Sequence, residues 1–453
     1  MEAYGLIVEP SRSIPILEEA DVCVLGGSCT GVFAAIRAAR LGARVILVER
    51  MGCFGGVATL SLVNLWHPPL DAFFDRQIIA GLTTDVMTRL SKRGAVRVKE
   101  RNVHDFWEFN SAELTIELDE MVREAKTVTP YLHTQFAAPY VGDDERLQGV
   151  IVENKSGRGA ILAKSFIDAT GDGDLCARLG LETYNANQIQ PSTTCAFLEG
   201  LSRLKGVDLG NLVQEHGAEY GFPQGFVWYA GIPGSDVIML AGTRVSGGSC
   251  ADASYLTYAE MEGRRQVRAI QDILRKYAPD TKLTLTTLPA RIGIRESRHV
   301  RCAYQLTKDD ILEGVRFDDA IANGTYPVDI HHSDKPGTTL MYLDGTQRYS
   351  CPGRPTEVSR WRPEGSANTP YYQIPLRSML PQGPYDNIVV AGRMIDADQA
   401  AHGAIRVMVN LNQTGEAAGV AAALAVRSQS GNIRAVSVGD VRNELASGGS
   451  IVL

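Results

Sequence analysis

Residues 21–50, DVCVLGGSCTGVFAAIRAARLGARVILVER, decide the fold class of this chain. The apolar residues 22–25 predict a strand, residues 43–50 predict a second strand, and the alanine-rich segment between them predicts a helix. Gly26 permits a tight turn after the first strand, and Gly31 allows the helix to pack closely against the sheet. The stretch therefore predicts a βαβ unit, the building block of a doubly wound α/β fold with a parallel sheet.

The loop before the helix departs from the dinucleotide-binding pattern G-x-G-x-x-G, because Ser28 stands where the middle glycine is expected. That position lets the backbone approach a pyrophosphate at the helix N-terminus, and serine is small and can donate a hydrogen bond to phosphate. Glu49 ends the second strand, where it can accept hydrogen bonds from a ribose. A βαβ unit with an empty turn is the alternative. The first strand, the loop, the helix, the second strand and its terminal glutamate together favour a bound dinucleotide. The predicted contacts are Gly26, Gly27, Ser28, Cys29, Thr30, Gly31, Glu49 and Arg50.

Three further segments indicate which dinucleotide is bound. A second glycine pair, Gly55 and Gly56, offers more backbone donors beside the same pyrophosphate. NAD domains do not usually need such donors, whereas a long two-part cofactor such as FAD does. Two later predicted strands also end in small residues, in FIDATGDGDL at 166–175 and in NIVVAGR at 387–393. One non-covalently bound FAD would lie across these strand ends, and its additional predicted contacts are Thr59, Phe136, Ala169, Gly171, Asp172, Gly392 and Arg393.

The segment GDGD at 171–174 imitates a second dinucleotide loop, because it follows a predicted strand and precedes a predicted helix. Two carboxylates beside a pyrophosphate would repel it. We therefore expect no dedicated NAD domain. Gly171 is expected to approach FAD closely, and Asp172 to bind a hydroxyl group or a water molecule.

The chain resembles the bacterial FAD-dependent oxidoreductases related to the flavin domain of heterodisulfide reductase, the domain found in its A-type polypeptide. More distantly, it is similar to other flavoproteins of the glutathione reductase type. The similarity runs over about residues 17–428 and is carried by DVCVLGGSCTGVFAAIRAARLGARVILVER, FGGVATLSLV, IDATGDGD, QPSTTCAF, IGIRESRHV, FDDAIANGTYPVDIHH, YYQIPLRSMLP and NIVVAGRMIDADQAAHGAIRVM. It implies FAD, a doubly wound nucleotide-binding domain and a cap domain, but no single substrate. Ser28 and Cys29 depart from the family pattern. The family name also suggests an iron–sulfur cluster, but none of the eight cysteines forms a C-x-x-C pair, so we expect none.

Composition and charge limit the classes of partner. Of the 453 residues, 44% are hydrophobic and 21% are charged, as in an ordinary globular protein. The net charge of -7 argues against nucleic acid and against anionic membrane surfaces. No apolar run reaches the roughly 18–20 residues that span a bilayer, residues 1–20 lack the apolar core of a secretory signal, and the scattered cysteines suit reduced thiols. We therefore expect a cytoplasmic enzyme that acts on a small molecule.

Two segments are predicted to build the FAD-binding domain. Residues 17–185 form its first part, with a helical insert at about 70–125, and residues 375–430 form its C-terminal part. Residues 186–374 are expected to form an α+β cap domain over the substrate, and residues 431–453 a C-terminal tail.

The segment that precedes the last predicted helix is the first place to look for catalytic groups. A helix at about 404–427 would present free N–H groups that stabilise negative charge on the reduced flavin ring, with Gly403 and Ala404 against the cofactor. Just before it, His402 is predicted as the base that takes a proton from the substrate, with a capping or packing histidine as the alternative. Arg406 is predicted as a second catalytic residue, with an ion pair to the cap as the alternative.

The predicted cap adds two more candidate catalytic residues. Arg295, in IGIRESRHV, would clamp an anionic or polyol substrate, although a salt bridge between domains is equally compatible with the pattern. His331, in YPVDIHHSD, is predicted as a substrate contact or a proton relay. Asp329, His331 and His332 together suggest a metal, but neighbours in an extended segment point apart, so we predict no metal site.

The pattern around four other polar or aromatic residues indicates no catalytic role. Trp66 and His67, beside two prolines, are expected to pack within a loop. Thr193 and Thr194 either line the pocket or are ordinary strand residues.

These residues favour an FAD-dependent oxidoreductase that transfers a hydride between bound flavin and a small polar metabolite, such as an alcohol, a sugar derivative or a carboxylate. Two alternatives stay open: a flavin subunit that passes electrons to a protein partner, and a flavin-binding protein without turnover. The electron acceptor and the oligomeric state have no signal in the sequence.

Overall fold

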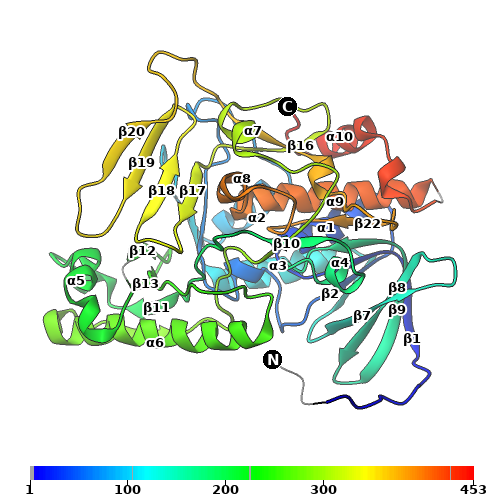
Figure 1. The fold of residues 1–453 in the computed structure, drawn as a ribbon, viewed down its shortest axis with the longest axis horizontal. Coiled ribbons are helices and arrows are strands. Elements are labelled where there is room, and N and C mark those ends of the chain that lie inside the picture. Colours follow the sequence, from blue (N-terminus) through cyan, green and yellow to red (C-terminus); the bar gives the residue numbers. More distant parts are fainter. Residues whose placement is uncertain (1–4, 105, 224–225, 429) are drawn as a thin grey trace.

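The computed structural model describes residues 5–104, 106–223, 226–428 and 430–453, and its largest sheet has seven strands (Figure 1). The strand order is β6-β2-β1-β9-β8-β7, and the seventh strand, β22, pairs with β9. All pairs are parallel except those that β8 makes with its two neighbours. The strands are β1 (Ile16–Leu25), β2 (Val45–Val48), β6 (Val128–Tyr131), β7 (Gln135–Val141), β8 (Leu147–Asn154), β9 (Gly157–Asp168) and β22 (Ile388–Val390). The predicted α/β fold, assembled from discontinuous segments, is confirmed.

The register of these strands brings three distant glycine-rich segments to one edge of the sheet. Leu25 at the end of β1 lies opposite Val48 of β2 and Asp168 of β9, and Asp168 lies opposite Val390 of β22. The loops that begin at Gly26, Ala169 and Ala391 therefore leave the sheet side by side.

Two helices that pack against this sheet cross with their backbones in contact. They are α1 (Cys29–Arg40) and α9 (Met408–Arg427). A Cβ atom on Gly415 would lie 2.1 Å from the carbonyl oxygen of Thr30, and one on Gly419 would lie 2.2 Å from that of Ala34. Only glycine allows this spacing. A buried ion pair between Arg37 and Glu416, 2.6 Å long, joins the same two helices.

The helix predicted at about 404–427 is two helices, which corrects the sequence prediction. The helix α8 (Gln399–Ile405) is capped by Asp398, whose side chain accepts a hydrogen bond from the N–H of Ala401. The chain then becomes extended at Val407, and α9 begins at Met408. Gly403 therefore lies inside a short helix and not at the start of the long one.

The predicted insert and tail also differ from the expectation. Residues 70–125 contain the helices α2 (Leu82–Lys92) and α3 (Ser111–Glu124), but the segment between them forms the strands β4 (Val96–Val98) and β5 (Trp107–Phe109). With β3 (Leu65–Trp66), which precedes α2, they make the sheet β3-β5-β4. The expected tail carries α10 (Val438–Ser447), which buries Val441 and Leu445 against the rest of the fold.

The region predicted as a cap contains two antiparallel sheets, which lie on the left in Figure 1. The first has the order β12-β13-β11-β14 and contains β11 (Ala196–Glu199), β12 (Trp228–Gly231), β13 (Val237–Ala241) and β14 (Thr284–Thr287), beside the helices α5 (Leu209–His216) and α6 (Ala253–Tyr277). The second has the order β17-β18-β19-β20 and contains β17 (Val328–His331), β18 (Thr338–Met341), β19 (Thr346–Ser350) and β20 (Glu357–Arg360). Buried apolar residues between 195 and 294 form clusters apart from the main core, whereas those between 300 and 343 belong to the main core. The domain boundaries at 186 and 374 stay a prediction.

Short elements complete the described fold. They are α4 (Asp174–Arg178), α7 (Lys308–Leu312), the pairs β10 (Thr183–Asn185) with β15 (Arg298–Val300) and β16 (Ala320–Gly324) with β21 (Tyr372–Pro375), and the 3-10 turns η1 (Gly56–Ala58), η2 (Leu201–Arg203), η3 (Gly217–Tyr220), η4 (Pro279–Thr281), η5 (Leu376–Met379) and η6 (Ile433–Ala435). Among the described residues, no helix is both long enough and apolar enough to cross a membrane.

The glycine contact between α1 and α9 leads to a stability prediction. We expect Gly419→Ala to lower the free energy of unfolding by about 1–3 kcal/mol, because the added Cβ forces the helices apart. Gly439→Ala in α10 is the control, since its Cβ would lie 3.6 Å from the nearest atom, the Ser437 hydroxyl oxygen. Alanine favours a helix, so the control should keep or gain stability. Urea denaturation of the FAD-loaded protein measures both variants, and equal stability would show that this contact does not set the helix spacing.

Candidate active site

A cavity opens at the sheet edge where β1, β2 and β9 end. Its walls include Gly26 and Ser28 of the first loop, Glu49 and Arg50 after β2, and Phe136 of β7. The N-terminus of α1 faces it without a side-chain cap and without an acidic residue in the first turn. The N–H groups at this helix end are therefore available to an anion.

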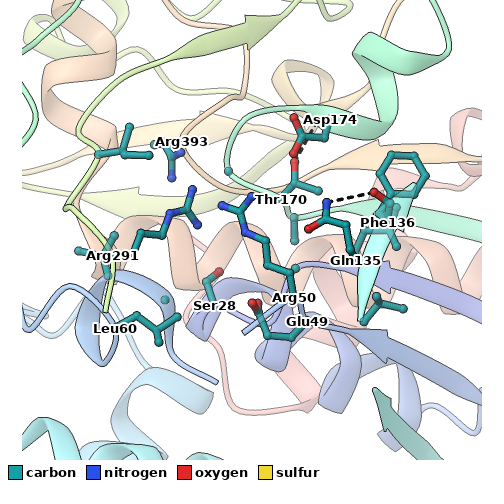
Figure 2. Close-up of a pocket in the computed structure, with 18 of the residues that line it drawn as sticks. Ser28, Glu49, Arg50, Leu60, Gln135, Phe136, Thr170, Asp174, Arg291 and Arg393 are labelled. Carbon is teal, nitrogen blue, oxygen red and sulfur yellow. Dashed lines mark hydrogen bonds between the residues drawn. The ribbon is translucent and has the colours of Figure 1, made fainter. Parts of the chain in front are cut away.

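Three arginines from separate segments extend into this cavity, as Figure 2 shows. They are Arg50, Arg291 and Arg393. Burial, together with the neighbouring charges of Arg50 and Arg393, lowers the pKa of Arg291 to about 10. Arg393 also has a buried Nε atom without a hydrogen-bond partner among the described residues. An anion bound here would relieve the repulsion and supply the missing acceptor, so these residues fit the pyrophosphate of a dinucleotide.

Asp172 holds two of these arginines from behind. Its carboxylate accepts hydrogen bonds from Arg393 and from the hydroxyl of Ser297 at 2.6 Å, and it lies 3.4 Å from Arg291. The cationic partners keep the pKa of the Asp172 carboxyl below its ordinary value in spite of burial. Asp172 lines neither cavity, so it positions arginines, and this place does not fit its predicted direct contact with FAD.

Glu49 lies at the opposite wall and keeps the first loop in place. One carboxylate oxygen accepts the N–H of Gly27 at 2.6 Å, and the other accepts the N–H of Met51 at 2.8 Å. Each carboxylate oxygen has a further lone pair, so both retain capacity for a ribose hydroxyl.

A second, larger cavity of about 610 Å³ adjoins the first and shares with it Ser28, Val57, Ala169, Gly171, Ile294 and Arg393. Its near wall contains predicted contacts from the glycine-rich loops, namely Cys29, Thr30, Gly55 and Gly392. Its far wall comes from the predicted cap and from the start of α9, with Val407, Met408 and Leu411. A long two-part cofactor can therefore continue from one cavity into the other.

At one end of the larger cavity, polar and charged side chains surround Asp329 on β17, and we call this region the polar end. One oxygen of this carboxylate, Oδ2, accepts hydrogen bonds from Arg406 at 2.7 Å and Tyr326 at 2.9 Å, and lies 3.4 Å from Nε2 of His331. These neighbours keep the pKa of the Asp329 carboxyl far below its ordinary value, against the effect of burial. Asp329 is therefore ionised, and it holds three cavity-lining side chains in fixed orientations.

Comparison with a family model identifies the group of proteins to which the chain is related. A sequence model of the family described as FAD dependent oxidoreductase matches residues 21–445. The chain belongs to this family. It is an FAD-dependent flavoprotein enzyme, and the predicted cofactor is confirmed. No curated protein matches the chain.

Solved structures with a related arrangement include several flavoproteins. One is a geranylgeranyl bacteriochlorophyll reductase-like protein from Thermoplasma acidophilum, with a TM-score of 0.49 and 11% identity over 95% of this chain and 83% of that one. The myxobacterial chondrochloren halogenase CndH has a TM-score of 0.44 and 15% identity over 94% and 78% of the two chains. PqsL from Pseudomonas aeruginosa, a probable FAD-dependent monooxygenase, has a TM-score of 0.41 and 13% identity over 95% and 91%. At TM-scores below 0.5, none of these similarities supports a conclusion about activity or substrate.

Most of the residues predicted to contact FAD line one of the two cavities of this oxidoreductase. The exceptions have structural roles. Gly27 donates to Glu49, and Gly31 lies so close to Gly26 that a Cβ would be 1.8 Å from its carbonyl oxygen. The hydroxyl of Thr59 closes a turn by donating to the carbonyl of Phe54. Gly403 and Ala404 line neither cavity, because α8 packs them against β17 and Tyr372.

His402 also lies outside both cavities, which does not fit the predicted role as a base in contact with substrate. Its side chain is fully buried, and Nε2 lies 3.2 Å from the carbonyl oxygen of Arg295. Burial lowers the pKa of the imidazole to about 3, so the ring is neutral. Arg295, Arg406 and His331, the other predicted catalytic residues, all line the larger cavity.

Several residues of the two cavities were missed or misjudged in the sequence. Trp66 and His67 line the larger cavity, where His67 stacks on Tyr326 with ring centres 4.1 Å apart. Asp329 was considered only as a metal ligand, and Arg291 was not considered. Arg291 comes from a segment far from every glycine loop, so only an expectation of anion-binding arginines could have drawn attention to it.

The contacts of Glu49 predict its contribution to FAD binding. We expect Glu49→Ala to weaken FAD binding by about 1.5–3 kcal/mol, because charge-assisted hydrogen bonds to the ribose and the support of the Gly27 loop are both lost. Glu199→Ala, at the exposed end of β11, is the control. Titration of apoprotein with FAD, followed by flavin fluorescence, gives both affinities. An unchanged affinity for Glu49→Ala would exclude the role in binding.

Proposed function

We propose that this flavoenzyme transfers a hydride between FAD and a small polar metabolite that carries a hydroxyl or carbonyl group. When bound, FAD supplies the hydride acceptor or donor. Binding of the substrate oxygen, its orientation and the movement of its proton fall to residues of this chain. We also propose that the chain is functionally related to the proteins that resemble the flavin domain of heterodisulfide reductase.

The observation that carries this proposal is a pair of unsatisfied polar atoms in the larger cavity's wall. Oδ1 of Asp329 and Nε of Arg406 are buried and have no hydrogen-bond partner among the described residues. One is an acceptor and the other a donor. The oxygen at the reacting carbon of the substrate can accept from Nε of Arg406 while its own proton stays available to a base, and a further polar group of the substrate can donate to Oδ1 of Asp329.

The charge of the polar end favours a substrate that also carries an acidic group. Arg295 and Arg406 are both cationic, and Asp329 supplies one negative charge. The guanidinium of Arg295 donates to the carbonyl of Pro191 and to the hydroxyl of Thr193, so its hydrogen bonds go to neutral oxygens. One positive charge is therefore left for an anionic group of the substrate.

His331 is the residue best placed to move the substrate proton. Its Nε2 faces Asp329, which orients the ring, and its Nδ1 lies 3.4 Å from the hydroxyl of Thr338. Burial lowers the pKa of His331 to about 4, although the charge of Asp329 opposes this shift. The ring is therefore neutral at neutral pH and able to accept a proton.

The uncapped N-terminus of α9 lies at the far wall, with no acidic residue in its first turn. We propose that its positive dipole stabilises negative charge on the cofactor ring during the reaction. Phe226, Trp228 and Tyr229 form a partly exposed aromatic side of the same cavity and would contact apolar parts of the substrate.

Flavin reduction by candidate metabolites tests the proposed function. Hydroxy acids, sugar acids and neutral polyols are mixed with the FAD-loaded protein without oxygen, and the flavin absorbance is followed. We expect bleaching by a hydroxy acid or a sugar acid. If none of these compounds bleaches the flavin, and only a reduced protein partner does, the chain is an electron-transfer protein.

Replacement of His331 tests the proton-transfer step. We expect His331→Asn to retain FAD and to lower the rate of flavin reduction by about 10²–10⁴-fold, the usual contribution of a general base. His332→Asn is a matched control, because the adjacent ring is not part of the cavity wall and its Nε2 lies 2.7 Å from the hydroxyl of Thr339. Stopped-flow absorbance measures both rates, and an equal rate for the two variants would exclude His331 as the base.

The same assignment predicts the pH dependence of flavin reduction. Because the base must be neutral, the rate should stay level as the pH falls through about 6.5, the ordinary pKa of histidine. It should decrease only as the pH approaches the lowered pKa of His331, about 4. Stopped-flow measurements across this range check the profile. A decrease centred near pH 6.5 would point to a solvent-exposed histidine.

A further inference from the structure

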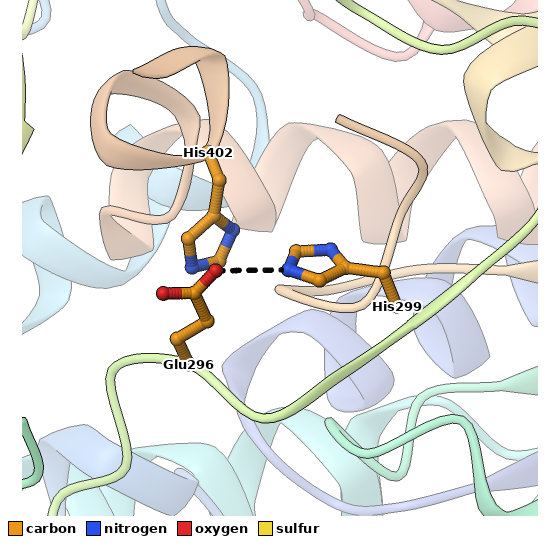
Figure 3. A group of neighbouring side chains, drawn as sticks. All are labelled: Glu296, His299 and His402. Atoms are coloured by element: carbon orange, nitrogen blue, oxygen red, sulfur yellow. Dashed lines mark hydrogen bonds and ion pairs between the residues drawn. The ribbon is translucent and has the colours of Figure 1, made fainter. Parts of the chain in front are cut away.

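Behind the wall of the larger cavity lies a buried polar group that has no part in the proposed reaction. It consists of Glu296 before β15, His299 in β15 and His402 in α8. Their exposed fractions are 1%, 1% and 0%. One possible ligand atom from each residue lies within 4.8 Å of the other two. Figure 3 shows the three side chains pointing toward one another, Glu296 and His299 from one segment and His402 from another.

Each imidazole uses one nitrogen to bond a backbone carbonyl. Nδ1 of His299 lies 3.1 Å from the oxygen of Ile395, and Nε2 of His402 lies 3.2 Å from the oxygen of Arg295. A carbonyl only accepts, so these two nitrogens carry the N–H. In a neutral ring the other nitrogen then has a free lone pair. Histidines that bind metal ions are commonly oriented in this way.

The two remaining nitrogens have no adequate partner within the protein. Nε2 of His299 lies 3.2 Å from Oε1 of Glu296, so a lone pair faces a carboxylate unless a cation or a proton lies between them. Nδ1 of His402 is buried without a hydrogen-bond partner among the described residues. Protonation of His299 would satisfy its contact with Glu296, but it would leave His402 unsatisfied. A metal ion would satisfy all three residues.

The carboxylate of Glu296 is also fixed in an orientation that suits a metal ligand. Oε2 of Glu296 accepts the N–H of Gln190 at 2.8 Å, which fixes the group and leaves Oε1 directed at the histidines. Two imidazoles and one carboxylate form a ligand set suited to zinc and similar divalent transition metals.

We propose that Glu296, His299 and His402 bind one divalent transition-metal ion, with zinc as the expected metal. Full burial points to a structural site. The ion would join α8 to the segment that carries Arg295, so it would fix two parts of the cavity wall. The sequence prediction of no metal considered only Asp329, His331 and His332. Glu296 and His299 are three residues apart, and only the fold brings His402, far along the chain, beside them.

Metal content measured on the FAD-loaded protein tests this site. The protein is produced in medium supplemented with zinc, freed of loosely bound ions on a chelating resin, and analysed by mass spectrometry for metal per chain. We expect one zinc ion per chain in the parent. Glu296→Gln should lose it, although glutamine keeps the size of the side chain and can still accept the N–H of Gln190.

The control is His216→Asn, which removes a histidine that also lies beside a glutamate, 3.2 Å from Glu219, but at the surface. This variant should keep the zinc. A parent without stoichiometric metal, a Glu296→Gln variant that retains it, or equal loss in the control would overturn the proposal. If Glu296→Gln does not fold, X-ray absorption at the zinc edge of the parent decides: nitrogen and oxygen ligands support the site, and sulfur ligands overturn it.

Discussion

The parallel register of β1, β9 and β22 is the constraint on which the rest of this flavoprotein depends. Because Leu25, Asp168 and Val390 lie abreast, the loops that follow them share one edge of the sheet. Parallel strands end in this way only when each connection crosses back over the sheet. The chain therefore has to bring β22, near its C-terminal end, back beside β9. The backbone contact of α9 with α1 through Gly415 and Gly419 holds this C-terminal segment in that position.

Positive charge is concentrated where this edge meets the predicted cap. Arg291 comes from the cap region, Arg50 and Arg393 come from two strand ends, and Asp172 holds two of the three guanidinium groups. A cluster of buried cations is unfavourable by itself, as the lowered pKa of Arg291 shows. A bound diphosphate would turn this repulsion into attraction. FAD would therefore help to hold the predicted cap region against the sheet, in addition to its part in the chemistry.

How much could be predicted from the sequence depended on how local each signal was. The βαβ unit and its glycines lie within one continuous stretch of sequence, and the structure confirms them. The three small-residue strand ends also indicated the shared edge correctly. The start of the last helix was misplaced by about one turn, because the extended Val407 separates α8 from α9. Asp398 followed by a run of helix formers was an available signal for that separate helix. Contacts between distant segments, such as Arg291 with Asp172 or His402 with Arg295, depend on tertiary packing and have no pattern in the chain.

The polar end of the larger cavity follows from the close approach of α8 to β17. A Cβ atom on Gly403 would lie 2.7 Å from the carbonyl oxygen of Asp329, so only glycine lets the helix come this near. At that distance Arg406 reaches Oδ2 of Asp329, which Tyr326 and His331 also contact. Among the described residues, the carboxylate thus receives its side-chain hydrogen bonds at Oδ2, and Oδ1 has no partner. A buried polar atom without a partner costs about 1–3 kcal/mol. That cost is offset when a ligand supplies the missing hydrogen bond, so the same geometry that destabilises the fold favours binding of a ligand that donates a hydrogen bond to Oδ1.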